Sequence, residues 1–308
     1  MQHWFTRRVP RRIAATCAIV CVGLAAGCGL TQGEDSYQMP AESSAASSYI
    51  PRANDSVERA GVGQKMPVYW LDNTDSGVYL YREYVQDTRH QEPISDAIAY
   101  LLAGKAADPG WYTHLKPSED IGASIDNSNL ITLDLPAKVF SAHLDRGLSE
   151  RTVQQLVFTA TAAAANSGIL VGNTPATVRI LVDGKPNEVV FGGYELQDVY
   201  ERDTRFMAPV WVIDPQFGSV VESGSVKITG RTSDFTKGTY YQLNAKGSAA
   251  ASKSAAAPNK LADKSIESDG SFELTTRLAP GSYELQLWGE NKASKEKIGL
   301  TTSEFTVK

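Results

Sequence analysis

The alternation of apolar and polar positions divides most of the chain into two regions of different character. Residues 66–204 mix strand-like and helix-like patterns, whereas residues 209–308 contain only strand-like patterns. The first region opens with aromatic and β-branched runs at 68–71 and 78–81, which flank the polar stretch 72–77. Such runs on either side of turn residues predict a strand, a turn and a second strand.

Two segments of the first region have a helical period. Residues 94–103 place their apolar side chains on one face and end before Gly104, a residue typical of helix ends. Residues 149–167 carry apolar side chains at i, i+3, i+4 and i+7, with Ser149 as the expected N-cap.

Further strands complete the first region. Residues 130–135 alternate in the manner of a half-buried strand, and strands at 178–182 and 188–191 flank the turn sequence 183–186. Because strands and helices are mixed without a regular strand–helix–strand repeat, we predict an α+β layer.

The second region predicts an all-β sandwich, because short strands recur between turn residues and no helical period is present. An Ala-, Ser- and Lys-rich stretch at 247–264 interrupts this rhythm, and we interpret it as a flexible inserted loop. The predicted strands are residues 210–213, 226–230, 240–244, 272–276, 283–288 and 305–307.

The N-terminus has the pattern of an export signal. A basic stretch with four arginines precedes the apolar run 13–26, which is shorter than the about 20 residues that a membrane-spanning helix needs. Ala25, Ala26 and Gly27 then lead directly to Cys28. This order resembles the lipobox, which implies cleavage between Gly27 and Cys28 and lipid modification of Cys28. The alternative is an ordinary cleaved signal with an incidental cysteine.

The composition indicates where the protein is located and which classes of partner it can bind. Of the three cysteines, Cys17 and Cys21 leave with the signal, so the exported chain has no internal disulfide. Loss of the four arginines takes the formal net charge from −5 to −9. A chain with a net negative charge is not expected to bind nucleic acid or to be held on anionic lipid by electrostatic attraction. We therefore expect the lipid on Cys28 to hold the protein at the extracytoplasmic face of the cell membrane.

Residues 28–65 are rich in Ser, Ala, Gln, Glu and Gly and have few large apolar side chains. Such a segment cannot bury enough surface to offset its ordering entropy, so we expect a disordered tether. At about 35 residues its root-mean-square span is roughly 30–35 Å.

Several motifs in the first region resemble the GerMN domain, which is found in the spore-germination protein GerM and its relatives. Val-Tyr-Trp-Leu-Asp at 68–72, followed by 77–85, resembles the opening hairpin of that domain. Leu-Leu-Ala-Gly at 101–104, Leu-Pro at 135–136 and Leu-Ser-Glu at 148–150 fit its later positions in order.

The second region resembles the immunoglobulin-like domain that often accompanies GerMN. The resemblance rests on Ile-Asp-Pro-Gln-Phe-Gly at 213–218, on 226–230, on Phe-Thr-Lys-Gly at 235–238 and on Asp-Gly-Ser-Phe at 269–272. The expected organisation is a signal peptide (1–27), a lipidated tether (28–65), an α+β GerMN-like domain (66–204) and an all-β immunoglobulin-like sandwich (209–308).

The resemblance implies association rather than catalysis. GerM-type domains are similar to ring-building modules of envelope-spanning machines, related lipoproteins associate with membrane signalling systems, and the family has no established catalytic residues. The leading hypothesis is therefore a non-enzymatic accessory or scaffold subunit of a membrane complex. We expect an envelope protein or a second copy as its partner, and neither a cofactor nor a metal.

A hydrolase is the least favoured of the functional hypotheses. The exported histidines are His90, His114 and His143, and they lack the spacing of a metal-ligand motif. Neither a nucleophile-elbow motif nor a phosphate-binding glycine loop is present. Because a Ser-His-Asp triad is assembled in space, a nucleophile beside one of these histidines stays an open alternative.

The spacing of five residues in the first region matches that of a calcium-binding EF-hand loop. Asp72, Thr74, Ser76, Gly77 and Glu83 stand at EF-hand positions 1, 3, 5, 6 and 12. Thr and Ser are poor donors where carboxylates or amides are preferred, and a strand, a turn and a strand explain the same residues. We therefore favour the turn over a metal site.

The alternative to a scaffold is a cell-wall glycan-binding lipoprotein. Such a protein would use exposed aromatic and acidic side chains. The aromatic residues that could form a stacking platform, for sugars or for a protein partner, are Trp70, Tyr79, Tyr81, Tyr84 and Trp111. Alternating aromatic residues in a strand are more often packed against neighbouring elements, so strand packing is the competing explanation.

Overall fold

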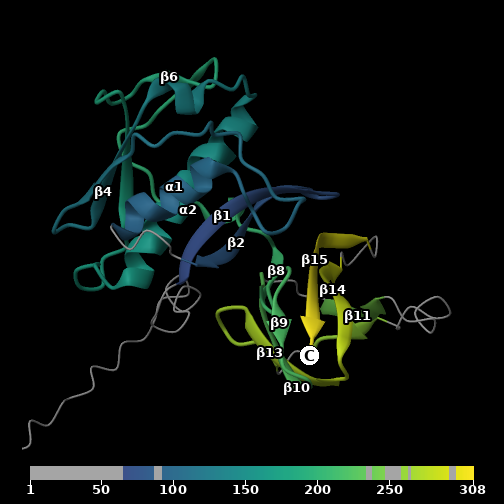
Figure 1. Cartoon of the computed structure of the whole chain (residues 1–308). Helices are drawn as coiled ribbons and strands as arrows, with labels where there is room; N and C mark the ends of the chain where they lie inside the picture. Colours follow the sequence, from purple (N-terminus) through teal and green to yellow (C-terminus); the bar gives the residue numbers. More distant parts are fainter. Residues whose placement is uncertain (1–64, 87–91, 234–237, 247–257, 263–264, 291–295) are drawn as a thin grey trace, which may run out of the picture. The chain divides into compact units, whose positions relative to one another are not determined.

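The computed structural model describes residues 65–86, 92–233, 238–246, 258–262, 265–290 and 296–308 (Figure 1). All of these residues belong to one compact unit. The signal peptide, the tether and Cys28 lie outside these ranges, so the cleavage site and the lipid anchor stay predictions. The elements from β1 to η2 form an α+β lobe, and those from β8 to β15 form a sandwich.

The α+β lobe begins with a long hairpin, as its aromatic runs predict. Strand β1 (Lys65–Thr74) pairs antiparallel with β2 (Gly77–Gln86), and Trp70 lies opposite Tyr81. The middle of each strand is buried on both faces, because successive side chains enter different apolar clusters. Burial on both faces accounts for the near-continuous run of large side chains.

Helix α1 (Pro93–Ala103) agrees with its prediction and ends at the left-handed Gly104. Helix α2 (Arg146–Ser167) begins earlier than expected, so the prediction of Ser149 as its N-cap is wrong. The carboxylate of Asp145 accepts from Leu148 N at 3.0 Å and caps the helix, while Ser149 is buried inside it. In the described part of the chain, neither helix is long and apolar enough to cross a membrane.

The central sheet of this lobe has the order β3-β4-β5, with β3 at Gly122–Ile125, β4 at Leu130–Leu135 and β5 at Thr177–Val182. Strands β4 and β5 confirm their predictions and pair in parallel, with α2 between them along the chain. The lobe thus contains one strand–helix–strand crossover that the pattern did not predict.

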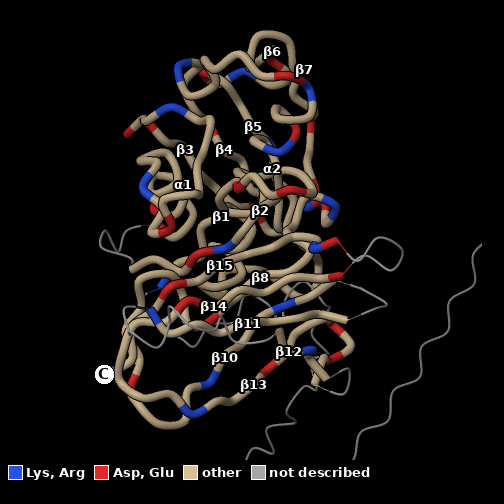
Figure 2. The backbone as a smooth tube through the Cα atoms, turned by 90° about the vertical axis from the view of Figure 1, so that its right-hand side faces the viewer, with Lys and Arg blue, Asp and Glu red and all other residues tan. Residues whose placement is uncertain are grey.

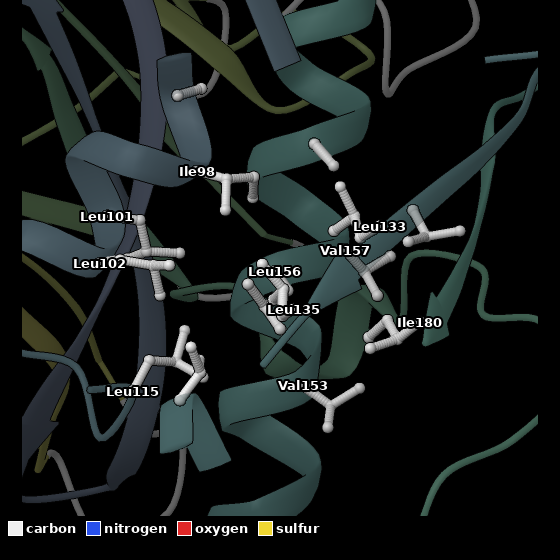
Figure 3. Close-up of a cluster of buried hydrophobic side chains, with 14 of the residues drawn as sticks. Ile98, Leu101, Leu102, Leu115, Leu133, Leu135, Val153, Leu156, Val157 and Ile180 are labelled. Carbon is white, nitrogen blue, oxygen red and sulfur yellow. The ribbon is translucent and has the colours of Figure 1, made fainter. Parts of the chain in front are cut away.

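Side chains from the helices and the sheet meet in one core, which positions α2 against β4 and β5. The close-up in Figure 3 shows the side chains that converge there. Its labelled members are Ile98, Leu101, Leu102, Leu115, Leu133, Leu135, Val153, Leu156, Val157 and Ile180.

The segment after β5 differs from its prediction. The expected strand at 188–191 is only β6 (Val189–Val190), which pairs with β7 (Tyr194–Glu195) rather than with β5. Asp183, Asn187 and Phe191 all have positive φ, so the backbone turns repeatedly here and cannot extend a β5 hairpin. The short 3₁₀ turns η1 (Ala137–Phe140) and η2 (Thr204–Phe206) complete the lobe.

In the sandwich, a three-stranded sheet of order β13-β10-β8 packs against a five-stranded sheet of order β12-β11-β14-β15-β9. Val226 and Ile228 of one sheet share a core with Leu285, Phe305 and Val307 of the other. The six predicted strands are confirmed and are longer than expected. Their bounds are β8 Val210–Asp214, β10 Gly224–Thr232, β11 Thr239–Lys246, β13 Ser271–Leu278, β14 Gly281–Glu290 and β15 Lys297–Val307, with β9 (Val220–Val221) and β12 (Asn259–Lys260) in addition.

The prediction of an inserted loop at 247–264 is wrong for part of that range. Strand β12 pairs with β11, and the next residue, Leu261, is only 2% exposed because it enters the sandwich core beside Phe272. Residues 247–257 and 263–264 lie outside the described ranges.

Asn129 anchors the loop between α2 and β5, and its replacement tests the fold of the lobe. It is 0% exposed and has a φ of 64°. Its amide donates to Val171 O at 2.9 Å and Thr174 O at 2.8 Å and accepts from Val171 N at 2.8 Å. Asn129→Ala should lower the free energy of unfolding by about 2–4 kcal/mol, measured by urea denaturation.

The matched control is Asn173→Ala, which removes an exposed amide from the same loop. It should change the free energy of unfolding by less than about 0.5 kcal/mol. Equal stabilities of the two variants would contradict the anchoring role of Asn129.

Candidate binding groove

An open groove of about 600 Å³ lies at the start of α2 in the α+β lobe. One wall is formed by Leu144, Arg146 and Ser149, and the other by Asn187 and residues 193–198 around β7. Acidic and basic residues are interspersed along the chain around β6 and β7 (Figure 2). None of the groove residues was singled out as a functional residue in the sequence.

Backbone hydrogen bonds connect the two walls of the groove. Phe191 N donates to Phe140 O at 3.2 Å, and Leu144 N donates to Phe191 O at 3.1 Å. The rings of Phe191 and Phe140 pack edge to face, with their centroids 5.5 Å apart. Gly192 has a φ of 84°, and a Cβ there would lie 2.8 Å from the ring of His143, so the turn needs glycine.

Polar contacts hold the second wall in shape. Asn187 Nδ2 donates to Asp198 Oδ1 at 2.9 Å, and Gln197 N donates to the hydroxyl of Tyr200 at 2.8 Å. Within the described residues, the side-chain amide of Gln197 makes no hydrogen bond. Burial raises the pKa of the Tyr194 hydroxyl above its usual value.

The structure does not support the aromatic platform predicted for glycan binding. Trp70, Tyr81 and Tyr84 are only 0%, 1% and 8% exposed, respectively. Tyr79 and Trp111 are half-buried, and Trp111 stacks on Tyr81 with 5.5 Å between ring centroids. These side chains are packed because both faces of the β1–β2 hairpin are covered.

The residues at calcium-loop spacing form a closed turn rather than a metal site. Thr74 Oγ1 donates to Gly77 O at 2.8 Å. Glu83 is turned into the protein, where Oε2 accepts from Trp70 Nε1 at 2.7 Å and Oε1 accepts from Ala107 N at 3.0 Å. Among the described residues, no group of three or more His, Cys, Asp and Glu side chains can hold a metal.

Two of the three histidines considered for catalysis, His114 and His143, lie in the described part of the chain. His114 packs edge-on against Tyr112, and burial, together with Lys116, lowers the pKa of its imidazole. His143 lies against Gly192, and His90 is outside the described ranges. In the part of the chain that the structure describes, neither imidazole hydrogen-bonds to a serine or an acid.

The charged carboxylate of Asp72 destabilises the folded protein, and this effect can be tested. Burial and the nearby Asp108 raise the pKa of Asp72 from 3.8 to about 6. Because the folded pKa lies above the unfolded value, the charged carboxylate destabilises the fold above about pH 6, and the penalty disappears below about pH 4.

Asp72→Asn should therefore raise the melting temperature at about pH 7.5 and lose this advantage at about pH 4. The gain should stay below about 1 kcal/mol, because the side chain is only half-buried and solvent screens its charge. Thermal melts at both pH values measure the effect, with Asp75→Asn in the exposed turn as the control. An equal shift for Asp72→Asn at both pH values would contradict the raised pKa.

Comparison with known proteins places the α+β lobe in a family. Residues 67–188 match the Germane family, described as "Sporulation and spore germination". The chain therefore contains a GerMN-type domain, as its motifs predict, followed by an immunoglobulin-like sandwich. None of the curated proteins matches the chain.

The solved structures that resemble parts of this chain do so at low sequence identity and low TM-score. The first GerMN domain of the sporulation protein GerM from Bacillus subtilis is 16% identical with a TM-score of 0.35, over 46% of this chain and 98% of that one. The tandem GerMN domains of that protein are 21% identical with a TM-score of 0.34, over 48% of this chain and 50% of that one. The M1 domain of titin is 14% identical with a TM-score of 0.18, over 32% of this chain and 93% of that one.

Proposed function

We propose that this protein is a non-enzymatic, lipid-anchored accessory or scaffold protein that binds a protein partner on the extracytoplasmic face of the cell membrane. The observation that carries the proposal is the GerMN-type domain at 67–188, in a chain that begins with a signal pattern and a lipobox ending at Cys28. The lipid holds the protein at the membrane, and the tether extends the folded lobes away from it.

Direct bonds between the two lobes support a scaffold role. Ala208 N donates to Leu80 O at 2.9 Å, Tyr84 N donates to Gln216 Oε1 at 2.8 Å, and Gly299 N donates to Ser76 Oγ at 3.1 Å. Tyr81 and Trp211 pack together at the same junction. The β1–β2 hairpin therefore contacts the sandwich directly.

The side chains considered for chemistry have structural neighbours, which supports a binding role over catalysis. Glu83 holds Trp70 and Ala107, and His143 packs against the Gly192 turn. The Germane description, sporulation and spore germination, names a process and not a reaction.

Crosslinking in intact cells tests the proposal. The native protein and Cys28→Ala, each with a C-terminal tag, are crosslinked, purified through the tag and examined by mass spectrometry. We expect specific membrane proteins with the native chain and their loss with Cys28→Ala, because only the native chain carries the lipid that holds it at the membrane.

The expression level of the two forms is the control, so that loss of the anchor is separated from loss of the protein. Recovery of only this chain, or of cell-wall fragments without a protein partner, would contradict the accessory role.

A further inference from the structure

We propose that the groove at the start of α2 binds a short, neutral oligosaccharide. This inference goes beyond the proposed function and uses none of the aromatic residues of the hairpin. It rests on the size of the groove, its preformed walls and the kinds of side chain that line it.

The groove has the dimensions of a ligand site. Its volume of about 600 Å³ falls within the usual range of roughly 300–1,000 Å³ for small-molecule sites. The backbone bonds of Phe191 to Phe140 and to Leu144 connect the walls, so the backbone of the groove is held in place before a ligand enters. A preformed site reduces the entropy cost of binding.

The lining supplies donors and acceptors side by side, as sugar hydroxyls require. A hydroxyl both donates and accepts, so vicinal hydroxyls are best matched by planar amides, carboxylates and guanidinium groups. Asn187 and Gln197 provide amides, Glu195 and Asp198 provide carboxylates, and Arg146 provides a guanidinium. The Gln197 amide makes no hydrogen bond to the described residues, so its donors and acceptor are available to a ligand.

The charges in the groove do not favour an ionic ligand. Arg146 Nε already pairs with Glu150 Oε1 at 2.9 Å, and Asp198 already accepts from Asn187. A phosphate would meet the carboxylates of Glu195 and Asp198, and a metal cation would meet Arg146. A neutral ligand with many hydroxyls avoids both repulsions.

The apolar part of the lining fits the C–H face of a sugar ring and not a peptide. Leu144 and Tyr194 are half-buried in the groove, and each leaves part of its apolar surface accessible. An extended peptide would need a long free strand edge or a deep apolar pocket. Here β7 has two residues and Leu196 is buried.

Titration of the full-length chain in detergent tests the site. The probes are the neutral tetramers of N-acetylglucosamine, glucose in β-1,4 linkage and glucose in α-1,4 linkage, and a polar hexapeptide of Ala, Glu and Lys. We expect saturable binding of at least one sugar by calorimetry. Gln197→Ala and Arg146→Ala should each weaken it by about tenfold, the effect of losing one good hydrogen bond.

Asn173→Ala is the matched control, because it removes an exposed amide beyond the opposite end of α2, roughly 30 Å away. It should leave sugar affinity unchanged, and unchanged melting temperatures should show that all variants are folded. The proposal is overturned if no sugar binds or if only the peptide binds. It is also overturned if Gln197→Ala and Arg146→Ala both bind sugar with the affinity of the native chain. The crosslinking experiment detects protein partners, whereas the titration detects sugar binding. The proposed function and the sugar site can therefore be contradicted independently of each other.

Discussion

The hydrogen bond between Trp70 and Glu83 is the interaction on which the α+β lobe depends. A buried carboxylate is costly unless its oxygens are bonded, and burial raises the pKa of Glu83 accordingly. Both of its oxygens are used, by Trp70 of β1 and by Ala107 after α1. The carboxylate thus joins the hairpin to the loop after the first helix, and Trp70 also packs edge-on against Tyr100 of α1.

The doubly buried hairpin also explains why the aromatic alternation of β1 and β2 does not form a binding surface. One face contributes Val68 and Trp70 to the main core, and the other packs Tyr69 against Phe158 of α2. Tyr81 reaches the cluster that contains Trp211 of the sandwich. Recognition is therefore expected elsewhere, on side chains that solvent can reach, and the groove beside β7 provides such side chains.

Periodicity predicted the hairpin, α1, β4, β5 and the six main sandwich strands, because these elements alternate strongly and end at turn residues. It misplaced the start of α2, since Asp145 and Ser149 are both good caps and only the structure shows which one is used. The groove was missed because its walls come from distant stretches joined by Phe191, whose positive φ no propensity predicts. The only local signal is the glycine pair after Phe191, which marks a turn but not a site.

The acidic and aromatic side chains of the hairpin have a structural role. The most direct test of this role is urea denaturation of Glu83→Ala and Glu83→Gln, monitored by tryptophan fluorescence. Glu83→Ala leaves the N–H groups of Trp70 and Ala107 without partners and should lower the free energy of unfolding by about 2–4 kcal/mol. Glu83→Gln keeps an acceptor oxygen and should lose less. A Glu83→Ala protein as stable as the native chain would contradict the account.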